Sequence, residues 1–222
     1  MPIRIDERLT AIATLIKGGT VADVGCDHGK LGYYLVSTDR AEKVIATDIS
    51  ALSLQKAQEL AFDNGVSHLM ETRLGDGLSP IKSNEADVVV IAGLGGDVMA
   101  EILSSARIEG KEFDHIVLSP NTHPEKVRRE LAHSHHTIVT DNLTECAGKY
   151  YTIISTQLNK DYKETLDDAQ IVYGKFFTTD EVFKKRALEE IATMRNILET
   201  HRSPQLEEKI ARLEGILEKV KI

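Results

Sequence analysis

Glycines and acidic residues recur in this sequence where short apolar runs end. Asp27 lies between Gly25 and Gly29, directly after the run of residues 21–24. Glycine lets a backbone approach a bound ligand closely, and a helix that starts there offers free N–H groups. The pattern is typical of a nucleotide-binding turn, although a strand-to-helix turn without a ligand has the same features.

A carboxylate follows each of two later runs of this kind. Asp48 ends the β-branched run of residues 43–48 and lies about 20 residues after Gly29 in the sequence. An acid at this position commonly accepts hydrogen bonds from ribose hydroxyls. Asp76 follows the run of residues 70–74. Because carboxylates accept hydrogen bonds from both hydroxyl and amino groups, these two acids suit an adenosine.

The charge of the first loop distinguishes between adenosine-containing cofactors. Asp27 would repel a pyrophosphate, and the spacing of Gly25 and Gly29 departs from the G-x-G-x-x-G of dinucleotide-binding turns. A cationic sulfonium would instead be attracted. We therefore expect S-adenosylmethionine (SAM) as the cofactor, in preference to NAD or FAD.

An α/β fold with a doubly wound, mostly parallel sheet is predicted to position these residues. Apolar runs alternate with segments of helical periodicity over the first two thirds of the chain. Helices are expected at residues 5–17, 31–37, 51–64, 97–106 and 124–132, and strands at 21–25, 43–48, 70–74, 86–92 and 113–118, with a closing strand pair at 137–140 and 151–156. Right-handed crossovers then bring the loops at the carboxyl ends of the strands to one rim.

Two further loops belong to this predicted rim, and several of its residues have ordinary structural interpretations. Gly93-Leu94-Gly95-Gly96 follows residues 86–92, and Pro120-Asn121 follows residues 113–118. The glycines also suit a tight turn without a ligand. Asp23 is equally explained by hydrogen bonds to neighbouring loops, and His28 by the start of a helix.

Length and composition favour one large domain with an extension. The chain has 222 residues, two cysteines and a formal net charge of −8. We expect a catalytic domain at residues 1–158 and an extension at 159–222, whose apolar spacing from about residue 180 predicts a helical coiled-coil hairpin. The charged N-terminus and the lack of a run of about 20 apolar residues predict a cytoplasmic protein that does not enter a membrane.

A metal site is not expected. His133, His135 and His136 are close in sequence, but no cysteine or acidic residue stands at ligand spacing from them, so a solvated helix end is the simpler interpretation.

Seven motifs together resemble the bacterial tRNA adenine-22 N1-methyltransferase family (TrmK). They are Glu7-Arg8-Leu9, Asp23-Val24-Gly25-Cys26-Asp27-His28, Arg73-Leu74-Gly75-Asp76-Gly77-Leu78, Ile91-Ala92-Gly93-Leu94-Gly95-Gly96, Pro120-Asn121, Gly148-Lys149-Tyr150-Tyr151 and Tyr173-Gly174. The resemblance implies a Rossmann-like class I SAM-dependent methyltransferase fold with a C-terminal coiled-coil hairpin. It also implies a tRNA substrate, methylated at N1 of one adenine in the D-arm region by a chain we expect to be monomeric.

The resemblance and the rim together give a set of candidate site residues. Asp27 is the candidate for stabilising charge, Asn121 for holding the base edge, and Arg8 for meeting the SAM carboxylate. The candidate cofactor-binding residues are Arg8, Asp23, Gly25, Asp27, His28, Gly29, Asp48, Ile49, Asp76, Gly77, Ala92, Gly93 and Gly95.

Three positions depart from the family pattern. Gly29 stands where the family usually has alanine, Ser119 where it has glutamine, and Thr47-Asp48 where it has Gly-Glu. The last change keeps the ribose-binding acid, whereas we expect the other two to touch the side of the target base.

Two other functions remain open on the sequence. A SAM-dependent methyltransferase for a small molecule or a protein would suit the acidic main domain, and a non-catalytic SAM-binding regulator would act through its hairpin. A basic patch beside the rim would favour the tRNA enzyme, and its candidates are Lys184, Lys185, Arg186, Arg195 and Arg202.

Overall fold

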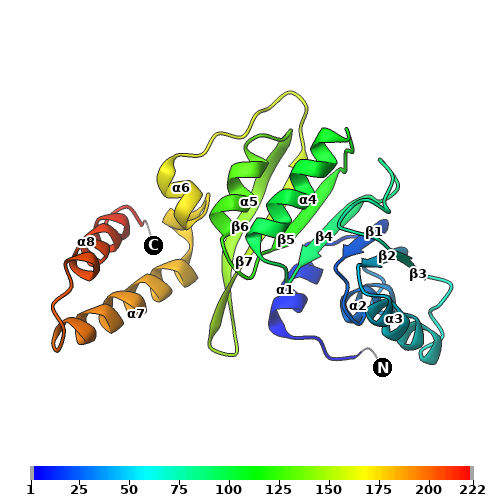
Figure 1. Ribbon diagram of the computed structural model, residues 1–222, viewed down its shortest axis with the longest axis horizontal. Coiled ribbons are helices and arrows are strands. Elements are labelled where there is room, and N and C mark those ends of the chain that lie inside the picture. Colours follow the sequence, from blue (N-terminus) through cyan, green and yellow to red (C-terminus); the bar gives the residue numbers. More distant parts are fainter. Residues whose placement is uncertain (1–2, 221–222) are drawn as a thin grey trace.

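The apolar runs form the centre of one seven-stranded sheet with the order β3-β2-β1-β4-β5-β7-β6 (Figure 1). The computed structural model describes residues 3–220. The first five strands pair in parallel, and β7 and β6 continue the sheet in antiparallel pairing. Their bounds are β1 Thr20–Val24, β2 Lys43–Asp48, β3 Met70–Leu74, β4 Val88–Ala92, β5 His115–Ser119, β6 His136–Cys146 and β7 Lys149–Leu158. The predicted doubly wound sheet is confirmed.

Helices cover both faces of the sheet. The helices are α1 Glu7–Thr14, α2 Lys30–Ser37, α3 Ala51–Asp63, α4 Gly96–Ile108 and α5 Pro124–Leu131. Ile12 of α1, Leu35 of α2 and Ala57 of α3 belong to one buried cluster, and Met99 of α4 and Val127 of α5 belong to the other. The strand order reverses between β1 and β4, so the carboxyl ends of the parallel strands open there into a crevice that suits a ligand.

The closing strand pair is much longer than the sequence predicts. The sequence predicts strands at 137–140 and 151–156 only, whereas Lys149 and Tyr150 already pair with Cys146 and Glu145. Ala147 and Gly148 both have positive φ, 50° and 73°, as a two-residue hairpin turn requires. The β6–β7 hairpin therefore extends beyond the rest of the sheet (Figure 1).

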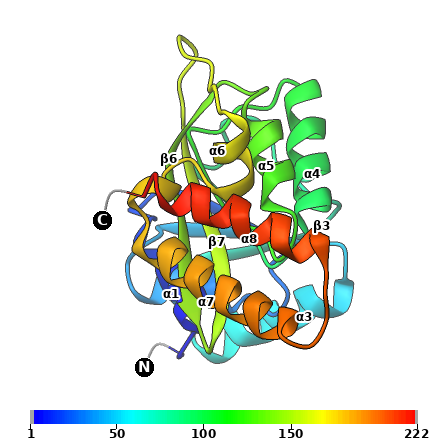
Figure 2. The same ribbon diagram turned by 90° about the vertical axis from the view of Figure 1, so that its left-hand side faces the viewer.

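The extension after β7 ends in two helices that pack together. It contains α6 Asp168–Tyr173, the 3₁₀ turn η1 Phe177–Thr179, α7 Glu181–Leu198 and α8 Pro204–Leu217. Ile191 and Met194 of α7 pack with Ile210 and Leu213 of α8, and Figure 2 shows the two helices side by side. The two predicted helices are therefore present, whereas supercoiling of the pair stays a prediction.

A buried charge network joins the extension to the main sheet. Arg128 of α5 donates two hydrogen bonds, at 2.8 and 2.9 Å, to the carboxylate of Asp141 in β6, and both side chains are almost completely buried. Arg128 also donates to the carbonyl oxygen of Ile171 in α6. Lys175 pairs with the buried Glu164 and donates its backbone N–H to Asp141. Segments on both sides of residue 158 thus share one polar core.

The expected solvated helix end is confirmed for two of the three histidines. His133 and His135 are exposed in the turn after α5. His136 is the exception: it begins β6, is 6% exposed, and its pKa is lowered to about 4, chiefly by burial. Within residues 3–220, no group of three His, Cys, Asp or Glu side chains is arranged to hold a metal ion.

Candidate functional site

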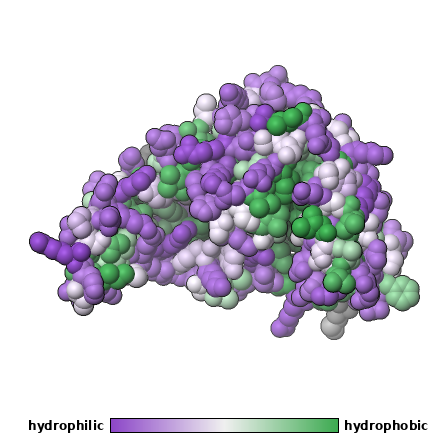
Figure 3. All heavy atoms as spheres, in the orientation of Figure 1, coloured by the Kyte–Doolittle hydropathy of each residue, from purple (hydrophilic) through white to green (hydrophobic). Residues whose placement is uncertain are grey.

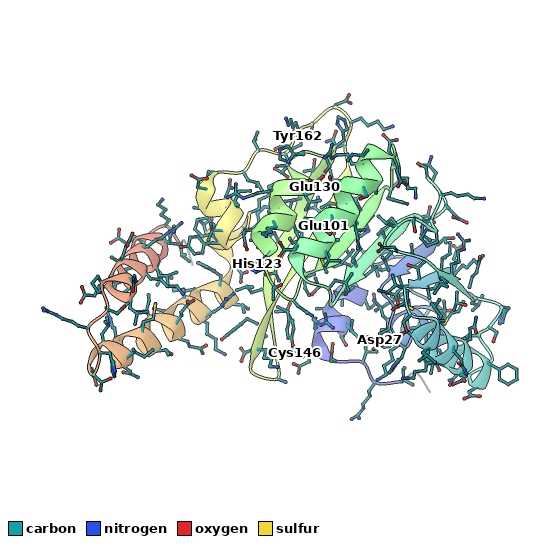
Figure 4. The ribbon with its side chains drawn as sticks, in the orientation of Figure 1. Asp27, Glu101, His123, Glu130, Cys146 and Tyr162 are labelled. Carbon is teal, nitrogen blue, oxygen red and sulfur yellow. The ribbon has the colours of Figure 1, made fainter. Side chains whose placement is uncertain are left out.

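A cavity of about 510 Å³ lies at the carboxyl ends of the strands, where the predicted rim residues meet. Its wall includes most of the candidate residues, from α1 and the loops after β1, β2, β3, β4 and β5. They are Arg8, Gly25, Asp27, Asp48, Ile49, Asp76, Gly77, Ala92, Gly93 and Asn121. Figure 4 places Asp27 toward the same edge of the molecule as Cys146 at the hairpin tip, and Tyr162 at the opposite edge. The fold therefore brings together residues that are far apart in sequence.

Backbone hydrogen bonds hold the first loop over the end of β2. The N–H groups of Gly25 and Cys26 both donate to the Thr47 carbonyl, at 2.8 and 3.0 Å. Asp27 adopts a left-handed φ of 51°, and its N–H donates to Asp48 Oδ2 at 3.0 Å. The side chain of Asp27 is 76% exposed, with its Oδ1 3.4 Å from His28 Nε2, and it borders the cavity.

The Asp48 carboxylate is fixed in place as an acceptor. Its second oxygen, Oδ1, accepts the Ser50 N–H at 2.8 Å, and Asp27 N–H occupies Oδ2. Each carboxylate oxygen has a further lone pair. A ligand with two neighbouring hydroxyls can therefore bind without reorienting Asp48.

Arg8 brings a cation to the wall of the same cavity. Its Nη1 is buried and makes no hydrogen bond within the described residues. It lies close to Gly93, because a Cβ atom added to that glycine would be 3.6 Å from Nη1. The guanidinium lies over the Tyr151 ring, 5.3 Å from its centroid. A buried donor without an acceptor is unfavourable, so Arg8 points to an anionic ligand group such as a carboxylate.

Asn121 lies beside Arg8 on the other side of Gly93. Its backbone N–H donates to the Leu94 carbonyl at 2.8 Å, and its side-chain Nδ2 donates to the Gly93 carbonyl at 2.5 Å. These bonds orient the carboxamide, so Oδ1 remains as its acceptor. Such an acceptor matches an exocyclic amino group of a base.

Apolar side chains form part of the cavity wall and suit contact with an adenine ring. Ile49 and Val98 are 74% and 45% exposed, respectively, and both border the cavity. Figure 3 shows hydrophobic surface over α4 and the strand ends near it. The sequence interpretation missed Val98, although its signal was present: Val98 is apolar but lies outside the buried stripe of α4 that contains Met99 and Ile102.

Four candidates lie outside the cavity wall: Asp23, His28, Gly29 and Gly95. Asp23 is buried beneath the start of α2, with Oδ2 unpartnered. Burial raises the pKa of Asp23 to about 7. A hydrogen bond from the Gly32 N–H lowers the pKa in part, and the negative charge of Asp48 raises it further. His28 Nε2 instead lies 3.0 Å from Lys56 Nζ. Direct cofactor contacts of the four stay predictions.

Gly29 does not face the presumed side of the target base. It has a φ of 67°, and an added Cβ would lie 2.7 Å from the Cβ of Ala57 in α3. This departure from the family pattern is therefore a packing feature of the α2–α3 contact. Ser119 is completely buried at the end of β5, and its hydroxyl is unpartnered within the described residues.

Thr47 is a second wall residue that the sequence interpretation did not assign. Its side chain is 1% exposed, its Oγ1 has no partner among the described residues, and it borders the cavity. Its sequence signal was a polar residue directly after the apolar run Val44-Ile45-Ala46.

The expected basic patch is partly neutralised by neighbouring acids. Lys185 pairs with Glu145 at the hairpin tip at 2.6 Å, and Arg195 pairs with Glu214 of α8 at 2.5 Å. No helix within residues 3–220 is both long and apolar enough to cross a membrane.

Comparisons with known proteins give relatives that span nearly the whole chain. The family described as "Methyltransferase domain" matches residues 5–154. The tRNA (adenine(22)-N(1))-methyltransferase of Bacillus subtilis (strain 168) is 30% identical over 205 residues, covering 89% of this chain and 85% of the relative. The crystal structure of the B. subtilis m1A22 tRNA methyltransferase TrmK is 28% identical with a TM-score of 0.77, covering 98% of this chain and 97% of the other. A Streptococcus pneumoniae protein solved with S-adenosyl-L-methionine is 26% identical with a TM-score of 0.84, covering 96% and 100%.

Proposed function

Because the chain belongs to the tRNA (adenine(22)-N(1))-methyltransferase family, we propose that it transfers a methyl group from SAM to N1 of an adenine in tRNA. The target is one adenine at position 22, in the D-arm region. The observation that carries the cofactor assignment is the buried, unpartnered Arg8 Nη1 in a cavity whose wall also presents the fixed Asp48 carboxylate.

The wall residues fit the groups of SAM one by one. Arg8 supplies the cation for the methionine carboxylate, and Asp48 supplies acceptors for the ribose hydroxyls. Ile49 and Val98 offer apolar surface for the adenine ring, and Asp76 borders the same cavity as an acceptor for its amino group. When bound, SAM would supply the methyl group from its sulfonium centre. The sulfur is the leaving group and keeps the electron pair of the C–S bond.

The chain's own task is then to position the acceptor base. Adenine N1 has an in-plane lone pair, so no residue has to remove a proton before it attacks. Asn121 holds the base edge through its oriented carboxamide, which brings N1 into line. The target must be unpaired or flipped out, because pairing occupies N1 in a duplex.

Asp27 provides electrostatic support for this reaction. The adenine ring becomes cationic as the N1–methyl bond forms. A carboxylate fixed near the reaction centre stabilises that developing charge, and the exposed Asp27 side chain borders the cavity from the first loop.

Incubation with methyl-labelled SAM and bulk tRNA tests the proposal. We expect label in tRNA, located at N1 of a single adenine when digested nucleosides are separated. Transfer to a protein or small molecule in a cell extract, with unlabelled tRNA, would contradict the tRNA assignment. SAM binding without transfer to any acceptor would favour a regulator instead.

Neither a metal nor a second copy of the chain takes part in the proposed cytoplasmic reaction. The N1 lone pair and the sulfonium leaving group need no Lewis acid, so EDTA is expected to leave the rate unchanged. Light scattering of the active protein is expected to give the mass of one chain. A dimer would refute the monomer prediction, and loss of activity in EDTA would refute the metal-free mechanism.

A further inference from the structure

The two neighbouring tyrosines of β7 point to opposite faces of the hairpin. Tyr150 donates its hydroxyl to Glu189 of α7 at 2.6 Å, and Arg186 of α7 lies 5.9 Å from its ring centroid. Tyr151 instead packs on Arg8, which borders the cavity. Successive strand residues alternate between faces, so Tyr150 anchors the hairpin to the extension while Tyr151 faces the site.

Arg8 and Gly93 connect Tyr151 with Asn121. Asn121 borders the cavity, and its side-chain Nδ2 donates to the Gly93 carbonyl at 2.5 Å. Arg8, which approaches both Tyr151 and Gly93, bridges the two positions.

The environment of Tyr151 suits a stacking partner. Its ring is half-buried, and within residues 3–220 its hydroxyl makes no hydrogen bond, so its placement depends on packing. The Arg8 guanidinium packs on the ring and restrains it. Tyr151 is therefore a restrained aromatic ring in contact with a wall residue of the cavity. Such a ring is typical of the platforms on which unpaired bases stack.

We propose that Tyr151 is the platform on which the target adenine stacks, with Arg8 aligning the tyrosine ring from the cofactor side. This inference rests on the proposed function, because it requires a nucleobase acceptor. The base would lie with its amino edge toward Asn121 and N1 toward the cavity. An aromatic face also attracts cations, so Tyr151 favours the positive charge that the ring gains on methylation.

Arg8 thereby links cofactor binding to base binding. A carboxylate bound by Arg8 fixes the guanidinium, and the guanidinium fixes the Tyr151 ring. We therefore expect the stacking platform to be better ordered, and tRNA to bind more tightly, when S-adenosylhomocysteine is present.

Kinetics of three variants test the platform. Tyr151→Leu keeps apolar bulk but lacks the aromatic face, and we expect kcat/KM for tRNA to fall by about 10- to 100-fold. Tyr151→Phe keeps the face and should stay within about threefold of wild type. Tyr150→Leu is the matched control on the same hairpin, and it should also stay within about threefold. S-adenosylhomocysteine affinity is measured for each variant and should change by less than about threefold.

Fluorescence gives a readout that does not depend on turnover. The chain has no tryptophan, so Tyr151→Trp and Tyr150→Trp each introduce a single fluorophore. We expect tRNA, added with S-adenosylhomocysteine, to quench the emission of Tyr151→Trp strongly through base stacking and to leave Tyr150→Trp nearly unchanged.

The outcomes separate this inference from the proposed function. A wild-type protein that methylates no tRNA overturns both. An active wild type whose Tyr151→Leu variant equals it in kcat/KM overturns only the stacking role of Tyr151. Equal losses in Tyr150→Leu and Tyr151→Leu, or equal quenching of both tryptophans, would assign the effect to the position of the hairpin and also overturn it.

Discussion

Replacing Arg8 with alanine is expected to weaken SAM binding about 30-fold while leaving the free protein nearly as stable as before. In the free protein the guanidinium has a buried Nη1 without a hydrogen-bond partner among the described residues. The substitution therefore removes no internal ion pair. Its main effect falls on the ligand carboxylate that Arg8 is proposed to bind.

The magnitude follows from the burial of Arg8. Two opposite charges about 4 Å apart attract by about 4 kcal/mol at the effective dielectric of a protein surface. Desolvation offsets part of this attraction, and hydrogen bonds to charged groups contribute about 1.5–3 kcal/mol net. A loss of about 2 kcal/mol corresponds to about a 30-fold change in Kd.

Two ligands make the assay specific for the carboxylate. S-adenosylhomocysteine and 5′-methylthioadenosine share the adenosine thioether, but only the first carries the amino-acid group. Calorimetric Kd values for both ligands with wild type and Arg8→Ala complete a double-mutant cycle. We expect the substitution to reduce affinity for S-adenosylhomocysteine about 30-fold and for 5′-methylthioadenosine less than threefold.

Two results would refute the reasoning about Arg8. If both ligands lose affinity equally, Arg8 supports the shape of the cavity and does not bind the carboxylate. If the unfolding free energy of unliganded Arg8→Ala falls by more than about 2 kcal/mol, the contact with Tyr151 is mainly structural, since an exposed cation–π pair contributes about 0.5–1 kcal/mol.

Three further predictions concern the ribose acceptor, a buried acid and the charge network. Asp48→Ala should weaken SAM binding at least tenfold in calorimetry, whereas Asn121→Ala should keep Kd within about threefold and lower the single-turnover rate at least tenfold; equal losses of affinity would contradict this division. Because burial raises the pKa of Asp23 to about 7, the folded state retains a proton that the unfolded chain releases, so the unfolding free energy should fall by a few kcal/mol as the pH rises from about 4 to 7. Urea titrations should show a flatter pH dependence for Asp23→Asn, and identical curves would refute the assignment. Arg128→Met should lower the unfolding free energy by about 3–5 kcal/mol, because Asp141 is then buried without its partner; adding Asp141→Leu should restore part of the loss, and failure to restore any would contradict a charge-based cause.

The sheet and the rim could be predicted because their signals are local. Alternating apolar runs and helical periodicity identify the strands and helices, and parallel order brings their carboxyl ends together. Gly25 and Asp48 each end a predicted strand, and Asn121 lies three residues after another, so their meeting at one cavity required no knowledge of side-chain contacts.

Features that depend on tertiary contacts were not predictable in the same way. Arg128 and Asp141 lie on different elements, and no spacing rule connects them, although together they form the main buried ion pair of α5. The Ala147–Gly148 turn looks like part of a loop until its two positive φ values are known. The packing of Gly29 against Ala57 of α3 was not predictable either, because the two residues are far apart in sequence.

The charge network around Arg128 limits how this architecture can be rearranged. Apart from Asp141 of β6, its acceptors and donors come from α6 and from Glu164 and Lys175, all beyond the end of the last strand. A chain shortened to residues 1–158 would keep every strand of the sheet, yet Arg128, Asp141 and the N–H of Ile138 would each lose a buried partner. The helical extension is therefore not an interchangeable module. Recombination that exchanged it for another helical element would preserve this buried network only if the crossover lay after residue 175.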